Sequence, residues 1–247
     1  MLELPKEKAR RVHPDASSLV ISNSKLYPSR VPKWLKTFIA FALLPLCVGA
    51  ALTLMRLLRV LGNADTFWVA VLGGAGCWLS VFLLLPKPMW VYVFGHELTH
   101  VLWTWLFGGR VKKFNVTSKG GHVLISKSNF LIVLAPYFFP LYVVIIVLFF
   151  ALGHVLLGWN RHWVWLHFLV GMAYAFHVTL TWHILQTQQS DITSQGYLFS
   201  AVIIFLGNIS VLLIGLTMVT ARVTTLNVLG WWLEESGRVV QRIGHLF

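Results

Sequence analysis

Charged residues are scarce in this chain, and acidic residues are the scarcest of them. Only 11% of the 247 residues are charged, 57% are hydrophobic, and 8 are acidic against 20 that are lysine or arginine. Soluble domains carry about a quarter charged residues, so this composition excludes an ordinary soluble domain. It predicts an all-α polytopic membrane protein, which the mean hydropathy of +0.73 also favours.

Cysteine is almost missing too. Cys47 and Cys77 both lie in apolar runs, which excludes a disulfide framework and a C-x-x-C pair.

The net charge of +12 would suit a nucleic-acid partner, but no RNA- or DNA-binding motif accompanies it. Because the basic residues are scattered over the termini and between apolar runs, we expect them to contact the anionic headgroups of a lipid bilayer.

Long apolar runs dominate the chain, each near the roughly 20 residues that cross a bilayer core. They predict about six transmembrane helices, over residues 37–55, 67–85, 88–107, 130–152, 163–185 and 197–219. Residues 1–36 are polar and basic and are predicted to form a tail, so the transmembrane domain covers 37–220. Apolar residues recur at helical spacing after residue 220, which predicts an amphipathic helix over 221–247 lying along the membrane surface.

The connection over residues 108–129 differs in kind from the other loops. It reads GGRVKKFNVTSKGGHVLISKSN, with glycine pairs at its start and at Gly120–Gly121 and with β-prone residues around the second pair. This pattern predicts a β-hairpin with its turn near KGG. Periodicity alone leaves a plain basic loop as an equal alternative.

Two carboxylates stand out because the surrounding sequence has no others. Between Asp65 and Glu234 the chain keeps only Glu97 and Asp191. A charged side chain in the middle of a bilayer costs about 2.5–3.5 kcal/mol even on lenient insertion scales. A chain that avoids acids over this whole stretch must therefore gain something from the two that it retains.

Glu97 belongs to the motif HELTH, which places His96 and His100 one helical turn apart. On a helix these two histidines share a face and can bind one metal ion, while Glu97 can reach a water molecule on that ion. H-E-x-x-H is the arrangement of zinc hydrolases, in which the glutamate is the general base. In the alternative, structural interpretation, the histidines bond neighbouring helices and Glu97 pairs with a basic side chain.

A catalytic zinc ion usually has three protein ligands. Asp191 is the leading candidate for the third, because the third and fifth predicted spans run in the same direction and end at the same membrane face. Asp191 could instead cap a helix or lie in a loop at the water boundary. His177 and His183, both in the fifth predicted span, are the rival ligands.

Taken together, these residues resemble the site-2 protease family of intramembrane zinc metalloproteases, particularly its compact bacterial members. The resemblance covers roughly residues 89–196 and rests on GHELTH, on the segment GGRVKKFNV…SKGGHV after it, and on LIVLAPYFFPLY. It implies that His96, His100 and Asp191 bind Zn²⁺ and that Glu97 is the general base. The aspartate–glycine pair typical of the family is here Asp191 followed by Ile192.

The resemblance also implies a substrate and a location. The substrate would be a membrane-embedded segment of another protein, held in an unwound form by strand addition to a membrane-associated hairpin. The location would be the inner membrane of a bacterial cell. The alternatives from other classes are a non-hydrolytic membrane protein that binds a metal or haem, and a degenerate protease that acts as a membrane scaffold.

Overall fold

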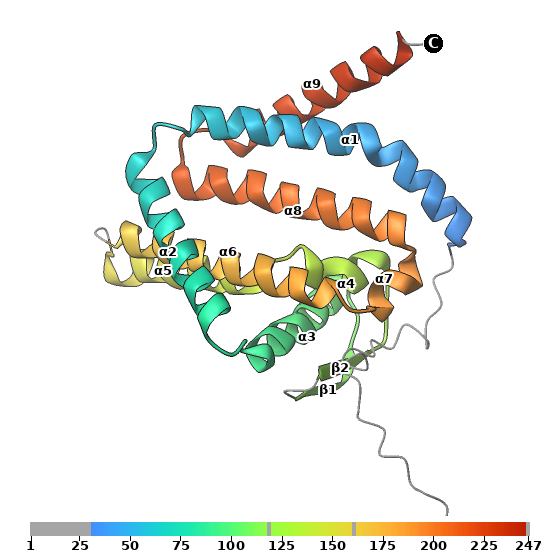
Figure 1. The fold of residues 1–247 in the computed structure, drawn as a ribbon, viewed down its shortest axis with the longest axis horizontal. Coiled ribbons are helices and arrows are strands. Elements are labelled where there is room, and N and C mark those ends of the chain that lie inside the picture. Colours follow the sequence, from blue (N-terminus) through green and yellow to red (C-terminus); the bar gives the residue numbers. More distant parts are fainter. Residues whose placement is uncertain (1–30, 118–119, 160–161, 246–247) are drawn as a thin grey trace, which may run out of the picture.

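The protein is described by a computed structural model that covers residues 31–117, 120–159 and 162–245 and is mainly helical (Figure 1). The predicted tail over 1–36 lies mostly outside the described residues, and helix α1 already begins at Lys33. Four helices are long and apolar enough to cross a membrane: α1 (Lys33–Val60), α2 (Asp65–Leu84), α6 (Trp163–Leu185) and α8 (Tyr197–Thr220). These four coincide with the first, second, fifth and sixth predicted spans.

The fourth predicted span is a bent pair of helices. The run is divided into α4 (Phe130–Leu134), the 3₁₀ turn η2 (Ala135–Tyr137) and α5 (Leu141–Leu157), with a bend of 80° between the two parts. Pro136 and Pro140 explain the break, because proline lacks the N–H that a helix needs and disfavours helix in the residue before it. The side-chain amide of Asn208 in α8 donates to the Tyr137 carbonyl oxygen at 3.1 Å and so satisfies an acceptor at the break.

The third predicted span is helix α3 (Met89–Leu106), which carries the HELTH motif. It begins directly after Pro88, and the chain then turns at Gly108, whose φ is +66°. Helix α3 is not one of the candidate membrane spans found among the described residues, because the polar HELTH motif lowers its mean hydropathy. The structure thus has four candidate spans, or five with the bent pair, and the expected six are not confirmed.

Close helix packing supports this arrangement, most closely between α2 and α6. A Cβ atom at Gly74 of α2 would lie 1.9 Å from the Phe168 carbonyl oxygen, and one at Gly171 of α6 would lie 2.0 Å from that of Val71. Glycine at both positions therefore lets the two backbones touch. Helix α1 packs against α8 (Figure 1). Residues of α6 and α8 line a cleft of about 650 Å³.

Helix α9 (Thr225–Gly244) occupies the region where an amphipathic helix was predicted. It passes behind α1 in Figure 1 and contacts it through an ion pair in which Arg56 Nη1 lies 3.0 Å from Glu234 Oε2. The indole N–H of Trp232 also donates to the Leu46 carbonyl oxygen at 3.0 Å. Its location at the membrane surface stays a prediction.

A β-hairpin follows α3, and it settles the choice between a hairpin and a plain loop. Strands β1 (Val111–Thr117) and β2 (Gly120–Ile125) are antiparallel, with Thr117 opposite Gly120 at the turn. β2 is the more buried strand, whereas β1 is exposed along most of its length. Both strands pack against α3, at the end of the molecule where α4 and α7 (Ser190–Gln195) also lie (Figure 1).

Candidate metal centre

Helix α3 holds His96, Glu97 and His100 in the interior of the protein. The two imidazole rings lie one turn apart on the same face, with ring centroids separated by 5.0 Å. Each histidine is only 4% exposed, and Glu97 is 1% exposed. The helical spacing predicted from HELTH is therefore present, and the three side chains of the motif are turned into the protein.

The short helix α7 brings Asp191 to these histidines. Its Oδ2 atom lies 3.6 Å from His96 Nε2 and 3.5 Å from His100 Nε2, and the carboxylate is fully buried. The three potential ligand atoms all lie within 4.8 Å of one another. Within the described ranges this is the one group of histidine, cysteine and acidic side chains that could hold a metal ion.

The position of α7 is fixed by contacts from three other elements. Lys36 of α1 donates from Nζ to Gln195 Oε1 at 2.5 Å, and this contact is buried. The hydroxyl of Tyr137, in η2, donates to Asp191 Oδ2 at 3.3 Å. The hydroxyl of Ser200 in α8 donates to the Ile192 carbonyl oxygen. Asp191 is thus a buried helix residue held by the fold and not an exposed loop residue, while its depth in a membrane stays a prediction.

Several buried polar atoms of these four residues have no hydrogen-bond partner in the described part of the chain. They are both ring nitrogens of His96, Nε2 of His100, Oδ1 of Asp191 and Oε1 of Glu97. Buried polar atoms normally have hydrogen-bond partners, so such a concentration of unsatisfied atoms needs an explanation. Two imidazoles and a carboxylate that converge on one point are a donor set that suits zinc, and an ion bound there would satisfy the facing atoms.

The charge state of Asp191 fits the same interpretation. Burial by itself raises the pKa of this carboxyl, but the imidazoles of His100 and His96 outweigh burial and hold the pKa below its usual range. The group is therefore an anion at neutral pH, as a metal ligand must be.

Glu97 lies directly beneath the hairpin. A Cβ atom at Gly121 of β2 would be 2.6 Å from Glu97 Cγ and 3.1 Å from the carbonyl oxygen of Asn115 in β1. Only a residue without a side chain lets the strand lie this close over the carboxylate. The second glycine of KGG is thus a site residue, because it sets the distance between the hairpin and Glu97.

The rival ligands lie elsewhere. His177 is buried in α6, and His183 is partly buried in the last turn of the same helix, but neither belongs to the metal-binding group in the described structure. The structural alternative for the motif holds only in part. The Nδ1 atom of His100 contacts the Ile132 carbonyl oxygen in α4. Among the described residues, however, His96 has no hydrogen bond to a neighbouring helix, and Glu97 has no ion pair with a basic side chain.

Two further residues of the site were missed by sequence reasoning. Tyr137 bonds Asp191 and packs its ring edge-on against His96, with centroids 5.3 Å apart. A tyrosine between two prolines in an apolar run was a usable signal, since a buried hydroxyl needs a partner. The second residue that was missed is Lys36. A lysine at the start of an apolar helix did not indicate that it would bind Gln195, which is 159 residues further along the chain.

Comparison with protein-family models, with curated proteins and with solved structures yields no match for this chain.

Proposed function

We propose that this protein is an intramembrane zinc metalloprotease, of the kind that the site-2 protease family represents. The observation that carries the proposal is the convergence of His96, His100 and Asp191, with ligand atoms within 4.8 Å, beside the buried carboxylate of Glu97. The same chain has four helices that are long and apolar enough to cross a membrane, or five with the bent pair. We place the protein in the inner membrane of a bacterial cell as a multi-pass protein.

Zinc is the proposed ion because two histidines and one carboxylate are its ligand set in several hydrolases, with a further position left for water. When bound, it would polarise a peptide carbonyl and make a water molecule more acidic. The protein's own contribution is to hold three ligands and to keep bulk water away from them. Tyr137 supports this by fixing the orientation of the Asp191 carboxylate.

Glu97 performs the proton transfers in the proposed reaction. Its carboxylate takes one proton from the attacking water, whose oxygen forms a bond to the carbonyl carbon of the substrate. The carbon–nitrogen bond then breaks, and Glu97 returns the proton to the leaving nitrogen. The products are one chain with a new carboxyl end and one with a new amine, so the water is fully accounted for.

The hairpin supports the choice of a membrane-embedded protein segment as the substrate. A helical segment hides its peptide bonds in its own hydrogen bonds, so it must unwind before water can attack. Strand β1 is exposed, and β2 lies directly over Glu97. An unwound segment that adds to this hairpin as a further strand would replace its lost hydrogen bonds within reach of the metal centre.

The test uses full-length protein in vesicles, together with a pooled library of single-span peptides, and mass spectrometry detects new chain ends. Wild-type protein loaded with zinc should cut some members of the library, and Glu97→Gln should lower that rate by at least about 10²-fold, the lower range for a lost acid–base group. Glu97→Gln should still bind one zinc ion per chain.

Cleavage by Glu97→Gln at the wild-type rate would overturn the assignment of the base. An absorption spectrum of the same preparation tests the competing class, because a Soret band would identify a haem protein and refute the zinc site.

A further inference from the structure

The two histidines of the proposed metal centre differ at their outer nitrogen atoms. The Nδ1 atom of His100 lies 2.8 Å from the carbonyl oxygen of Ile132 in α4, and this contact orients its ring. The Nδ1 atom of His96 is buried and has no partner among the described residues. Histidine ligands of metals almost always donate their second N–H to a carboxylate, a carbonyl or a water molecule. His96 therefore lacks a support that His100 has.

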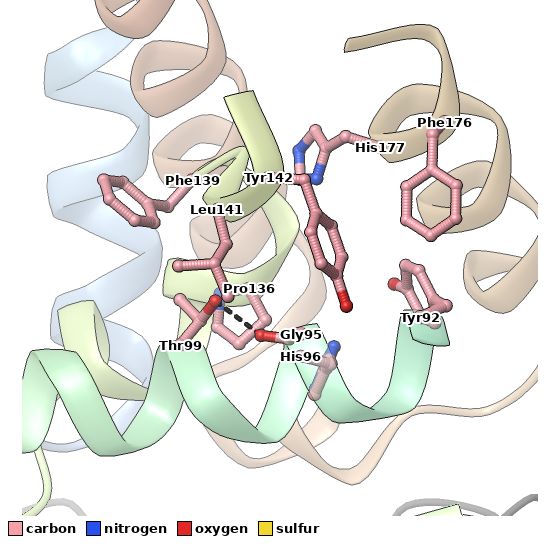
Figure 2. Close-up of a pocket in the computed structure, with 10 residues that line it drawn as sticks. All are labelled: Tyr92, Gly95, His96, Thr99, Pro136, Phe139, Leu141, Tyr142, Phe176 and His177. Carbon is pink, nitrogen blue, oxygen red and sulfur yellow. Dashed lines mark hydrogen bonds between the residues drawn. The ribbon is translucent and has the colours of Figure 1, made fainter. Parts of the chain in front are cut away.

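A small cavity lies against His96, and Figure 2 shows His177 of α6 on a facing wall of it. Its volume is about 20 Å³. One water molecule needs a cavity volume of about 10–15 Å³ and two to four polar partners. The cavity therefore has room for one ordered water molecule.

The hydroxyl groups on the cavity wall donate their protons to other atoms. The hydroxyl of Tyr142 donates to the Val91 carbonyl oxygen, that of Thr99 to the Gly95 carbonyl oxygen, and that of Tyr92 to Thr181 Oγ1 at 3.5 Å. His177 differs, because its Nε2 is buried and unpartnered in the described structure and its side chain is only 7% exposed. Two unsatisfied imidazoles, from α3 and α6, thus border one cavity of the size of a water molecule.

We propose that a water molecule in this cavity accepts a hydrogen bond from His96 Nδ1 and donates one to His177 Nε2. This inference rests on the proposed metal centre and adds His177 to it as a positioning residue. His177 was a rival ligand by sequence, and in this arrangement it acts at one remove, by fixing the ring that is the ligand. The proton on Nδ1 leaves Nε2 of His96 free to face Asp191, 3.6 Å from its Oδ2 atom.

Zinc affinity is the measurement that tests this role. Full-length protein in detergent competes for Zn²⁺ with a chromophoric chelator, in wild type, His177→Leu, His177→Gln and His183→Leu. Loss of an outer partner of a metal ligand typically weakens affinity 10- to 100-fold, so we expect about that loss in His177→Leu. His177→Gln retains a polar end and should recover most of the affinity. His183→Leu, on the same helix but outside the cavity, should match wild type.

A spectroscopic signal separates positioning from a general effect on the fold. In the cobalt-substituted protein, the ring N–H protons of the histidine ligands give strongly shifted NMR signals that exchange with solvent. His177→Leu should move or broaden one of the two signals and leave the other, from His100, in place.

Three results would overturn the proposal. They are zinc affinity in His177→Leu equal to that of wild type, an equal loss in His183→Leu, and a visible cobalt spectrum that shows a lost ligand in His177→Leu. Wild-type protein that binds no zinc would refute the metal centre itself. Wild-type protein that binds zinc but cuts no peptide would refute only the proposed reaction.

Discussion

Replacing Gly121 with alanine should displace Glu97 without touching any metal ligand. The added methyl carbon would lie 2.6 Å from Glu97 Cγ and 3.1 Å from the Asn115 carbonyl oxygen. Because carbon atoms in contact are normally about 3.5–4.0 Å apart, Glu97 or the strand must retreat by about 1 Å. A displacement of that size near the reacting atoms can lower a rate by about 10²-fold, so we expect roughly that loss of peptide cleavage.

The assay compares Gly121→Ala with Gly76→Ala in the vesicle cleavage reaction. Gly76 lies in α2, and a Cβ atom there would meet no atom within 4 Å, which makes it a matched control for the change itself. Zinc content is measured in parallel and should stay at one ion per chain, because the three atoms nearest to the new methyl group belong to Glu97 and Asn115 and not to a metal ligand. Wild-type cleavage by Gly121→Ala would refute the placement of the hairpin over the base, and so would loss of zinc.

Two further changes test the ligand set and the helix packing. Asp191→Ala should reduce bound zinc well below one ion per chain, because the two remaining histidines leave the ion short of its usual three protein ligands. Elemental analysis of purified protein measures the zinc content. A full zinc content would show that Asp191 is not a ligand. Gly171→Val should lower the free energy of unfolding by about 1–3 kcal/mol or more, which is the usual cost of overpacking. The reason is that its Cβ atom would lie 2.0 Å from the Val71 carbonyl oxygen. An unchanged midpoint of thermal unfolding in detergent would contradict this prediction.

The residues of the candidate site were predictable from sequence because each carries its own cost. Glu97 and Asp191 are acids in a region otherwise free of them, and His96 and His100 have a spacing that needs only a helix to align them. The pairing of Asp191 with the histidines depends on how α7 meets α3. From the sequence, this pairing could be predicted only from the direction of the predicted spans. The choice between Asp191 and His177 as the third ligand stayed open.

The number of spans was less predictable, because a hydropathy window counts apolar residues and not straight helices. The run at 130–152 has the composition of one span, yet it bends by 80° where prolines interrupt it. The bend has a local cost, which the Asn208 side chain reduces by donating to the Tyr137 carbonyl oxygen. The same bend brings the Tyr137 hydroxyl to Asp191, so the irregular part of the run is also the part that reaches the site.

A stability argument connects the site to the fold. A buried polar atom without a hydrogen-bond partner costs about 1–3 kcal/mol. The Nε2 atoms of His96 and His100 are two such atoms, and both face Asp191, where a bound ion would satisfy them. Apolar side chains of similar volume would avoid this cost. The chain keeps the polar set and holds it in place with Lys36 and Tyr137, which is consistent with a bound ion that stabilises the folded protein as well as serving the reaction.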